Sequence, residues 1–276
     1  MSGSSDKIEL VPVEQVSPTS SNFFVGVLVI LALIIVVYFV YEFIFRKTAG
    51  VAAGGPSFII AGPSSAGKTS LFTLIHYGKK ADTVPSIEQN VTTHFRLPSV
   101  PDTAKPFILI DTPGHQKLRH GFFDALRIAQ AAKTAKGVVF VIDAGAVSRP
   151  EKLREAAEYL YDVLQITEKT RGGIDILVAA NKSELFTAVP AKRLRSLFET
   201  ELDKIRKSRA KSVGKVGGEK QGQNENEEVD DAEWPGDHDK QLKLEDLESE
   251  ITVIDGSVAR VNTDGWIRWM EERAVN

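Results

Sequence analysis

Apolar and polar residues follow one another in blocks along most of the chain, and these blocks predict strands that alternate with helices. Short apolar runs predict buried strands, and stretches with apolar residues three and four apart predict helices. The predicted strands cover residues 57–61, 92–97, 106–111, 137–143, 175–181 and 251–255. The predicted helices cover residues 68–78, 116–135, 150–167, 191–209 and 263–273. This alternation predicts an α/β fold, in which helices cover both faces of a mostly parallel six-stranded sheet.

A different pattern precedes this domain. The run from Phe23 to Tyr41 carries no charge and is long enough to cross ~30 Å of hydrocarbon as a helix. We therefore expect a transmembrane helix over residues 22–45, with a buried core helix and a cleaved signal peptide as the alternatives. Because Arg46 and Lys47 follow the run directly, the positive-inside rule places the rest of the chain in the cytosol and the N-terminus across the membrane.

The remaining segments are polar. Residues 1–21 are expected to be a disordered tail, residues 46–56 a linker, and residues 57–276 the main domain. Residues 214–239 are acidic and rich in glycine, which predicts a disordered insertion before the last strand. The basic stretch at 204–211 fits a solvated helix end, with a face for anionic lipid or ribosomal RNA as the alternative.

Composition narrows the function classes. The chain has 276 residues, a net charge of −3 and no cysteine. The charge argues against a general nucleic-acid-binding surface, so no direct, specific nucleic-acid binding is expected. The absence of cysteine excludes disulfides and thiolate metal sites.

The first motif that carries chemistry lies directly after the first strand of the domain. The stretch AGPSSAGKTSLF has Gly62, four residues, and then Gly67, Lys68 and Thr69, which is the spacing of a P-loop between a strand and a helix. Its backbone N–H groups would cradle phosphate, Lys68 would bridge the β- and γ-phosphates, and Thr69 would bind Mg²⁺. The expected nucleotide-binding residues of this loop are Gly62, Ser64, Ser65, Ala66, Gly67, Lys68, Thr69 and Ser70.

A second motif, ILIDTPGH, ends the third strand. Asp111 at the strand end would hold Mg²⁺ through water, and Gly114 would let its backbone N–H approach a γ-phosphate. The D-x-x-G pattern alone also describes an ordinary turn. Because it lies one strand after a P-loop here, the D-x-x-G pattern indicates a nucleoside triphosphatase.

Two further loops indicate which base is bound. ILVAANKSE delivers Asn181, Lys182 and Glu184 at a strand end, in the pattern N-K-x-D that reads guanine, with a longer acid in the last place. Guanine offers N1–H and a 2-amino group to such an acid, and adenine offers neither. VIDGSVAR then supplies the loop that would give backbone N–H groups to guanine O6, at residues 257–259, which are Ser257, Val258 and Ala259.

Together these motifs make a small GTPase of the Ras/Arf type. TVPSIEQN, residues 83–90, resembles the switch I segment T-I-P-T-I-G-x-N of Arf GTPases, and the alignment makes Ser86 a ligand of Mg²⁺. His115 takes the place of the residue that orients the attacking water, so it is the candidate catalytic residue. Arg119, on the same switch, is expected to face solvent or a partner.

The combination of an apolar anchor, this switch I, D-T-P-G-H and N-K-S-E resembles the beta subunits of the signal recognition particle receptor. The resemblance implies a single-pass protein of the endoplasmic reticulum membrane with its N-terminus in the lumen. It implies a GTP- and Mg²⁺-dependent switch with slow intrinsic hydrolysis, whose switch loops bind the N-terminal domain of the receptor's alpha subunit. A ribosome or the translocon is a further candidate partner.

Three alternatives stay open at this point. The first is a membrane-spanning Arf-like GTPase in vesicle traffic, the second an ATP-hydrolysing enzyme, and the third a scaffold that only binds GTP.

Overall fold

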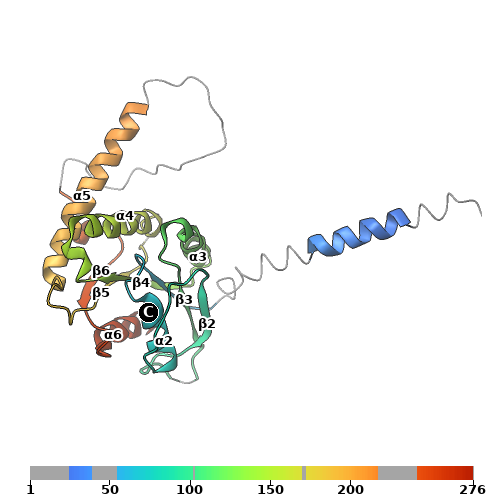
Figure 1. The fold of residues 1–276 in the computed structure, drawn as a ribbon, viewed down its shortest axis with the longest axis horizontal. Coiled ribbons are helices and arrows are strands. Elements are labelled where there is room, and N and C mark those ends of the chain that lie inside the picture. The colour runs from blue at the N-terminus through green and yellow to red at the C-terminus, as the bar shows by residue number, and fades with distance from the viewer. Residues whose placement is uncertain (1–24, 39–54, 102, 170–171, 217–240, 276) are drawn as a thin grey trace, which may run out of the picture. The chain divides into compact units, whose positions relative to one another are not determined.

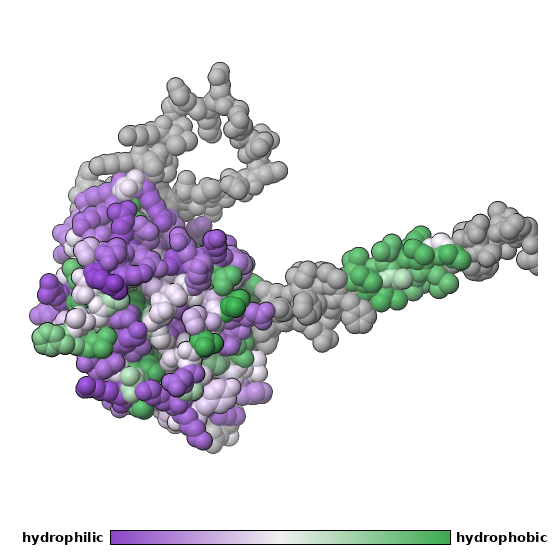
Figure 2. All heavy atoms as spheres, viewed as in Figure 1, coloured by the Kyte–Doolittle hydropathy of each residue, from purple (hydrophilic) through white to green (hydrophobic). Residues whose placement is uncertain are grey.

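The computed structural model of this chain describes residues 25–38, 55–101, 103–169, 172–216 and 241–275. The chain divides into two units, Met1–Thr48 and Ala49–Asn276. In the first unit, residues 25–38 form a helix of 14 residues whose side chains are all exposed and mostly hydrophobic, as Figure 2 shows.

Within these described ranges, no helix meets the length and hydropathy needed to cross a membrane. The rest of the expected transmembrane segment, residues 22–24 and 39–45, lies outside the described residues, as do the expected tail at 1–21 and most of the linker.

The second unit is built on one six-stranded sheet (Figure 1). Its strands are β1 (Ser57–Ala61), β2 (Asn90–Phe95), β3 (Phe107–Asp111), β4 (Ala135–Asp143), β5 (Ile176–Asn181) and β6 (Ile251–Asp255). They lie in the order β2-β3-β1-β4-β5-β6, and every neighbouring pair is parallel except β2 with β3. The predicted mostly parallel sheet is confirmed.

Helices cover both faces of this sheet, as the sequence predicts. They are α2 (Lys68–Tyr77), α3 (His120–Ala131), α4 (Pro150–Thr167), α5 (Ala191–Val216) and α6 (Asp264–Val275), with short 3₁₀ turns η1 (Gln116–Leu118), η2 (Ala146–Ser148) and η3 (Leu244–Asp246). Buried residues of α3, α4 and α5 form one hydrophobic cluster with the sheet, and those of α2 and α6 form the other.

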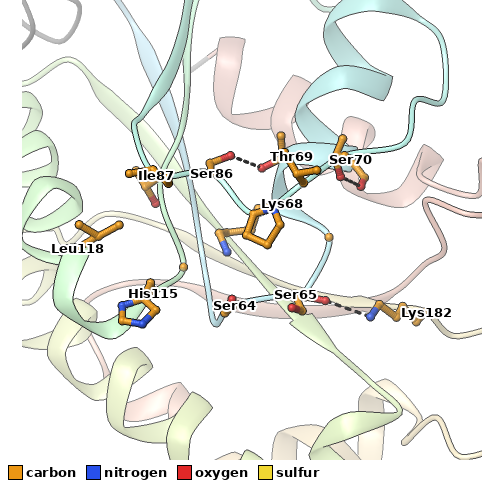
Figure 3. Close-up of a pocket in the computed structure, with 16 residues that line it drawn as sticks. Ser64, Ser65, Lys68, Thr69, Ser70, Ser86, Ile87, His115, Leu118 and Lys182 are labelled. Atoms are coloured by element: carbon orange, nitrogen blue, oxygen red, sulfur yellow. Dashed lines mark hydrogen bonds between the residues drawn. The ribbon is translucent and has the colours of Figure 1, made fainter.

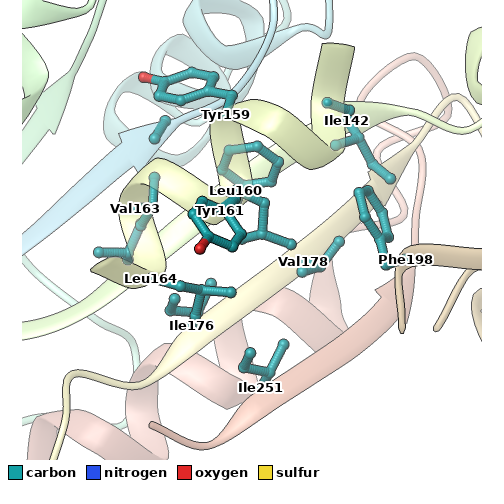
Figure 4. Packing of buried hydrophobic residues seen from close by; sticks show 14 of the residues in the cluster. Ile142, Tyr159, Leu160, Tyr161, Val163, Leu164, Ile176, Val178, Phe198 and Ile251 are labelled. Atoms are coloured by element: carbon teal, nitrogen blue, oxygen red, sulfur yellow. The ribbon is translucent and has the colours of Figure 1, made fainter. Parts of the chain in front are cut away.

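The apolar runs explain why the central strands are buried on both faces. Phe58, Ile59 and Ile60 of β1 are completely buried. Side chains alternate along a strand, so Ile59 packs into the cluster of α3, α4 and α5 while its two neighbours pack against α2 and α6. Figure 4 shows the first cluster, where Phe198 of α5 and Leu160 of α4 meet β5. This packing fixes the carboxyl ends of the strands at one edge, where the motif loops lie.

Some element bounds differ from the prediction. The single helix expected over 116–135 is instead η1 followed by α3, which ends at Ala131. Lys133 then takes a left-handed backbone with φ of 54°, which turns the chain into β4 at Ala135. The prediction placed the end of the helix at residue 135, too late, because apolar alanines continue the helical pattern through this turn. Likewise β2 starts at Asn90, since its pairing with β3 begins there, opposite Asp111.

Helix α5 is longer than predicted and reaches Val216, so the first residues of the expected insertion are helical. Residues 217–239 lie outside the described part of the chain. Four basic side chains of the 204–211 stretch are paired: Lys204 with Glu201, Lys207 and Arg206 with Asp203, and Arg209 with Asp162 on α4. Arg206 is buried rather than solvated, and the pairing of all four cations argues against a surface for lipid or RNA.

The packing generates a stability prediction with a matched control. Phe198 is completely buried between α5 and the sheet, whereas Phe186, in the loop after β5, is fully exposed. Phe198→Ala should lower the free energy of unfolding by about 3–5 kcal/mol, because it removes a buried ring and leaves a cavity. Phe186→Ala should change it by less than about 0.5 kcal/mol. Urea unfolding of both variants at one fixed nucleotide concentration checks this; equal costs would contradict the assigned core.

Candidate functional site

The P-loop lies between β1 and α2, where the chain turns sharply over the carboxyl end of the sheet. Gly62 and Gly67 have φ of 136° and 97°, in the region that favours glycine. A Cβ at Gly62 would overlap the backbone oxygen of Val141, and one at Gly67 would overlap the side-chain amide of Asn181. The two glycines of the motif are therefore required by close packing as well as by backbone conformation.

A cavity of about 430 Å³ opens above this loop (Figure 3). It is lined by Ser64, Ser65, Gly67, Lys68, Thr69, Ser70, Thr83, Val84, Pro85, Ser86, Ile87, Thr112, Gly114, His115, Leu118 and Lys182. The cavity therefore brings together four segments that are separate in the sequence: the P-loop, the predicted switch I, the D-x-x-G loop and, through Lys182, the N-K-S-E loop. Its volume lies in the usual range for sites that hold small ligands.

The three predicted metal ligands meet at one corner, where Thr69 and Ser86 line the cavity and Asp111 lies behind them. The Thr69 hydroxyl donates to Asp111 Oδ2 at 2.8 Å, and Ser86 Oγ lies 2.9 Å from the same Thr69 oxygen. Because the single Thr69 proton goes to the carboxylate, Ser86 must donate to Thr69. The amide of Asn90 donates to Asp111 Oδ2 at 2.8 Å and to Ser86 Oγ at 3.3 Å. A continuous chain of donors thus runs from switch I to the strand end.

Asp111 is completely buried at this corner, and its other oxygen, Oδ1, has no hydrogen-bond partner among the described residues. Burial raises the pKa of Asp111 above its ordinary value, and the hydrogen bonds from Asn90 and Thr69 and the charge of Lys68 act against that rise. A buried carboxylate oxygen without a partner is costly. The corner therefore fits a cation held through water, with two hydroxyl oxygens beside it.

Lys68 points into the cavity from the first turn of α2. Its side chain is nearly buried, and Nζ donates to the backbone oxygen of Pro63 at 2.8 Å. Burial lowers the pKa of Lys68 to about 8; the charge of Asp111 acts against this shift and that of Arg119 adds to it. An anion in the cavity would offset the cost of this desolvated ammonium.

The D-x-x-G loop passes close over the P-loop. A Cβ on Gly114 would overlap Lys68 Nζ and would lie 2.8 Å from both the Pro63 oxygen and the Ser64 Cα. Only glycine allows this approach. The next residue, His115, is exposed at the cavity rim, and its Nδ1 accepts a hydrogen bond from the backbone N–H of Lys117 at 3.3 Å. The structure thus places His115 at the cavity that the P-loop also lines.

Arg119 contradicts the expectation that it faces solvent or a partner. Only 7% of its surface is exposed. Its guanidinium lies 4.1 Å from the centre of the Tyr159 ring, and Nη2 is 3.5 Å from Glu155 on α4. The prediction was wrong because Tyr159 and Glu155 follow it by about 40 residues, and sequence pattern does not show that α4 covers this loop.

The predicted base-reading loops meet at the ends of β5 and β6. Asn181 is buried, and its amide donates to the Ala66 oxygen at 2.8 Å while its oxygen accepts from the Val258 N–H at 3.0 Å. The N–H of Ser183 bonds the Gly256 oxygen at 3.1 Å, which places the segment before Ser257 against the N-K-S-E loop. One asparagine therefore joins the phosphate loop to the loop that contains Val258.

The acid of this motif fits a role in ligand binding. Glu184 is partly buried, and its Oε2 is inaccessible to solvent without a hydrogen-bond partner in the described structure. Lys182 has a left-handed backbone with φ of 63°, and its Nζ donates to the Ser65 oxygen at 3.0 Å. Glu184 does not line the cavity, so a ligand that offers hydrogen-bond donors would reach this carboxylate only after the side chain turns toward it.

Two residues of the site were missed from the sequence. Asn90 bonds both Asp111 and Ser86, and the asparagine that closes the switch I pattern was the available signal. Asp143 accepts from Lys182 Nζ at 2.7 Å, and its place at the end of β4 was the only sign of it.

The low pKa of Lys68 generates a pH prediction for nucleotide-free protein. Its folded pKa, about 8, lies below the unfolded value of 10.5, so the unfolded state binds the proton more tightly. Below pH 8 the buried ammonium lowers the free energy of unfolding. This free energy should therefore rise by about 3 kcal/mol as the pH rises from 8 to 10.5. Lys68→Met should remove this rise and the exposed control Lys79→Met should keep it, measured by urea unfolding in EDTA. Parallel profiles for wild type and Lys68→Met would contradict the burial of a charged ammonium.

Comparison with known proteins agrees with this geometry. A family model described as signal recognition particle receptor beta subunit matches residues 54–252. The signal recognition particle receptor subunit beta of Saccharomyces cerevisiae is 36% identical over 219 residues, which cover 79% of this chain and 84% of the yeast protein.

Two solved structures from Chaetomium thermophilum are also similar. A signal recognition particle receptor SRb–GTP/SRX complex is 30% identical with a TM-score of 0.60, and the match covers 79% of this chain and 97% of that one. An SRb–GDP–Mg structure is 32% identical with a TM-score of 0.57 and the same coverage. This chain belongs to the family of signal recognition particle receptor beta subunits.

Proposed function

We propose that this chain is the GTP-binding switch subunit of a signal recognition particle receptor, and that it docks the alpha subunit at the endoplasmic reticulum for co-translational protein targeting. The observation that carries the proposal is the convergence of Ser86 on Thr69 and Asp111. It joins the phosphate end of the cavity to switch I, so the ligand can control a surface segment. Family membership favours this function over vesicle traffic.

The ligand is GTP. The P-loop from Gly62 to Ser70 cradles its phosphates, and Lys68 supplies positive charge to them. The carboxylate of Glu184 would turn toward the base and accept from the N1–H and 2-amino groups of guanine, with Asn181 and Lys182 ordering the loop. The backbone from Ser257 to Ala259 closes the base site. The GTP and GDP in the titles of the Chaetomium structures support this assignment.

Bound Mg²⁺ would supply positive charge that offsets the charge of the phosphates. Thr69 and Ser86 would hold it directly, and Asp111 would hold it through water, since Asp111 Oδ1 has no other partner in the described residues. Asn90 keeps the carboxylate and Ser86 oriented toward this point. The GDP–Mg relative supports the choice of metal.

The chain is a slow GTPase whose bound nucleotide works mainly as a structural element. His115 at the rim would orient the attacking water. No arginine is among the described residues that line the cavity, and Arg119 is held over Tyr159. Transition-state charge is therefore stabilised without an arginine finger from this loop, which keeps hydrolysis slow.

Switch I presents the docking surface. Val84 and Ile87 line the cavity and are 81% and 78% exposed, which is unusual for large apolar side chains beside a ligand site. Ordering of Ser86 around the metal would fix both of them in position. The SRb–GTP/SRX complex of the relative supports an alpha-subunit partner at the GTP-bound form. Contact with a ribosome or the translocon would follow through that partner.

We infer that the apolar segment at 22–45 anchors the chain as a single pass in the endoplasmic reticulum membrane, with the GTPase domain cytosolic. Its support is the uncharged run from Phe23 to Tyr41 and the cations Arg46 and Lys47 that follow. Anchoring would keep the docking surface near the site of translocation.

Glu184 gives the first test of this function. Glu184→Ala should lower GTP affinity roughly 10- to 100-fold, because guanine loses a charged acceptor for its donors. The affinity of Glu184→Ala for ATP should not fall below that of the wild-type chain. Glu184→Asp is the matched control, since it keeps the acid and should retain the preference for GTP. Calorimetric titration of the full chain with each nucleotide and Mg²⁺ measures this, and unchanged GTP affinity in Glu184→Ala would refute the base assignment.

Ile87 gives a second test. Ile87→Asp should weaken binding of the alpha subunit's N-terminal domain at least about tenfold, because a charge replaces an exposed apolar contact. Binding is measured with GTP in saturating excess, so that any loss of nucleotide affinity does not enter the result. Phe186→Asp, at a still more exposed apolar position outside the switch, should bind the partner normally. The opposite ranking of the two variants would place the interface elsewhere.

A further inference from the structure

Asp143 lies at the carboxyl end of β4 and belongs to none of the motifs that indicate nucleotide binding. It pairs in register with Asn181, the last residue of β5. Asp143 does not line the cavity, whereas Lys182, the residue after Asn181, does. The carboxylate of Asp143 therefore lies behind Lys182 and outside the layer of residues that line the cavity.

The two oxygens of this carboxylate have separate partners. Oδ1 accepts from the backbone N–H groups of Gly145 at 3.0 Å and Ala146 at 2.9 Å, which fixes the carboxylate against the start of η2. Oδ2 accepts from Lys182 Nζ at 2.7 Å. The bonds to Oδ1 hold Oδ2 in a fixed orientation, so Asp143 presents a preset acceptor to the ammonium.

Lys182 in turn joins two loops. Its Nζ also donates to the backbone oxygen of Ser65 in the P-loop at 3.0 Å. Ser65 and Lys182 both have left-handed backbones, with φ of 61° and 63°. Such conformations persist in non-glycine residues when surrounding contacts hold them. The ammonium of Lys182 is one of those contacts, and its position depends on Asp143.

Backbone contacts reinforce this arrangement. The backbone N–H of Ala144 donates to the backbone oxygen of Asn181, and the N–H of Val189 donates to the backbone oxygen of Ala144, both at 2.9 Å. A Cβ on Gly145 would lie 2.9 Å from a Leu185 methyl and 3.0 Å from the Thr187 hydroxyl. The segment after Asp143 and the N-K-S-E loop are thus packed tightly together, so the distance from Asp143 to Lys182 is set by the fold.

We propose that Asp143 is a positioning residue for guanine-nucleotide retention, which holds the Lys182 ammonium on the Ser65 carbonyl and so keeps the base loop joined to the phosphate loop. This rests on the proposed function, because it assumes that the two loops bind one nucleotide. Without the carboxylate, the ammonium would be drawn to water or to the phosphates, since its side chain is 33% exposed. The hydrogen bond between Lys182 and Ser65 would then break more often, and nucleotide would dissociate faster.

The variant that separates charge from structure is Asp143→Asn. Its side-chain oxygen can still accept from Gly145 and Ala146, while an amide replaces the acceptor of Lys182. The full chain, loaded with a fluorescent GDP analogue, is followed during dissociation into excess unlabelled GDP. Asp143→Asn should release the analogue about tenfold faster than wild type, equivalent to about 1.4 kcal/mol. Glu158→Gln, which breaks the exposed Arg154–Glu158 pair on α4, should release it at the wild-type rate.

A double-mutant cycle with Lys182→Ala identifies the route of the effect. If Asp143 acts through Lys182, Asp143→Asn should cause no further acceleration in the Lys182→Ala background. Full multiplication of the two effects would overturn the proposal, because Asp143 would then act through the turn that it caps. A wild-type rate for Asp143→Asn would also overturn it. Failure of the wild-type chain to bind the analogue would instead refute the proposed function, which keeps the two failures distinct.

Discussion

The chain of hydrogen bonds from Asn90 through Ser86 and Thr69 to Asp111 is the interaction on which the rest of this account depends. The four residues lie on three segments: Asn90 and Ser86 on switch I, Thr69 in the first turn of α2, and Asp111 at the end of β3. Because a hydroxyl has one proton, the direction of the chain is fixed by its acceptor at the buried carboxylate. A cation at this corner would compete for the same oxygens, so its arrival would reorganise switch I.

A second set of hydrogen bonds joins the P-loop to the base loops. Asn181 bonds both Ala66 and Val258, and Lys182 reaches Ser65, so the chain's own side chains tie these loops together. The parallel sheet makes this possible, since it brings the ends of β1, β4, β5 and β6 to one edge. The rigid part of the site is therefore built by the fold, while Val84 and Ile87 on switch I stay exposed. A switch needs both properties.

The sequence predicted most of the sheet because its central strands are continuous apolar runs that must be buried on both faces. It predicted the P-loop residues because glycine spacing between a strand and a helix has few other uses. It predicted Ser86 only through resemblance to the Arf switch, and the contact with Thr69 agrees with that alignment. The break between α3 and β4 was predicted after residue 135 and lies after Ala131, because apolar alanines continue the helical pattern beyond the end of α3.

Arg119 and Asp143 show the limit of pattern reading. Arg119 lies in a polar loop, and its burial comes from Tyr159 on α4. Asp143 looks like an ordinary strand end, and its role comes from the pairing of β4 with β5. Both depend on contacts between segments about 40 residues apart, which local periodicity does not encode.

The central claim is that bound nucleotide controls the docking surface through Ser86. The most direct test is the affinity of the full chain for the alpha subunit's N-terminal domain, measured by titration with either GTP or GDP bound in the presence of Mg²⁺. This account predicts at least about tenfold tighter binding to the GTP form, because a ligand can shift a conformation only by its differential affinity for the two states. Equal affinity for the GTP and GDP forms would contradict it.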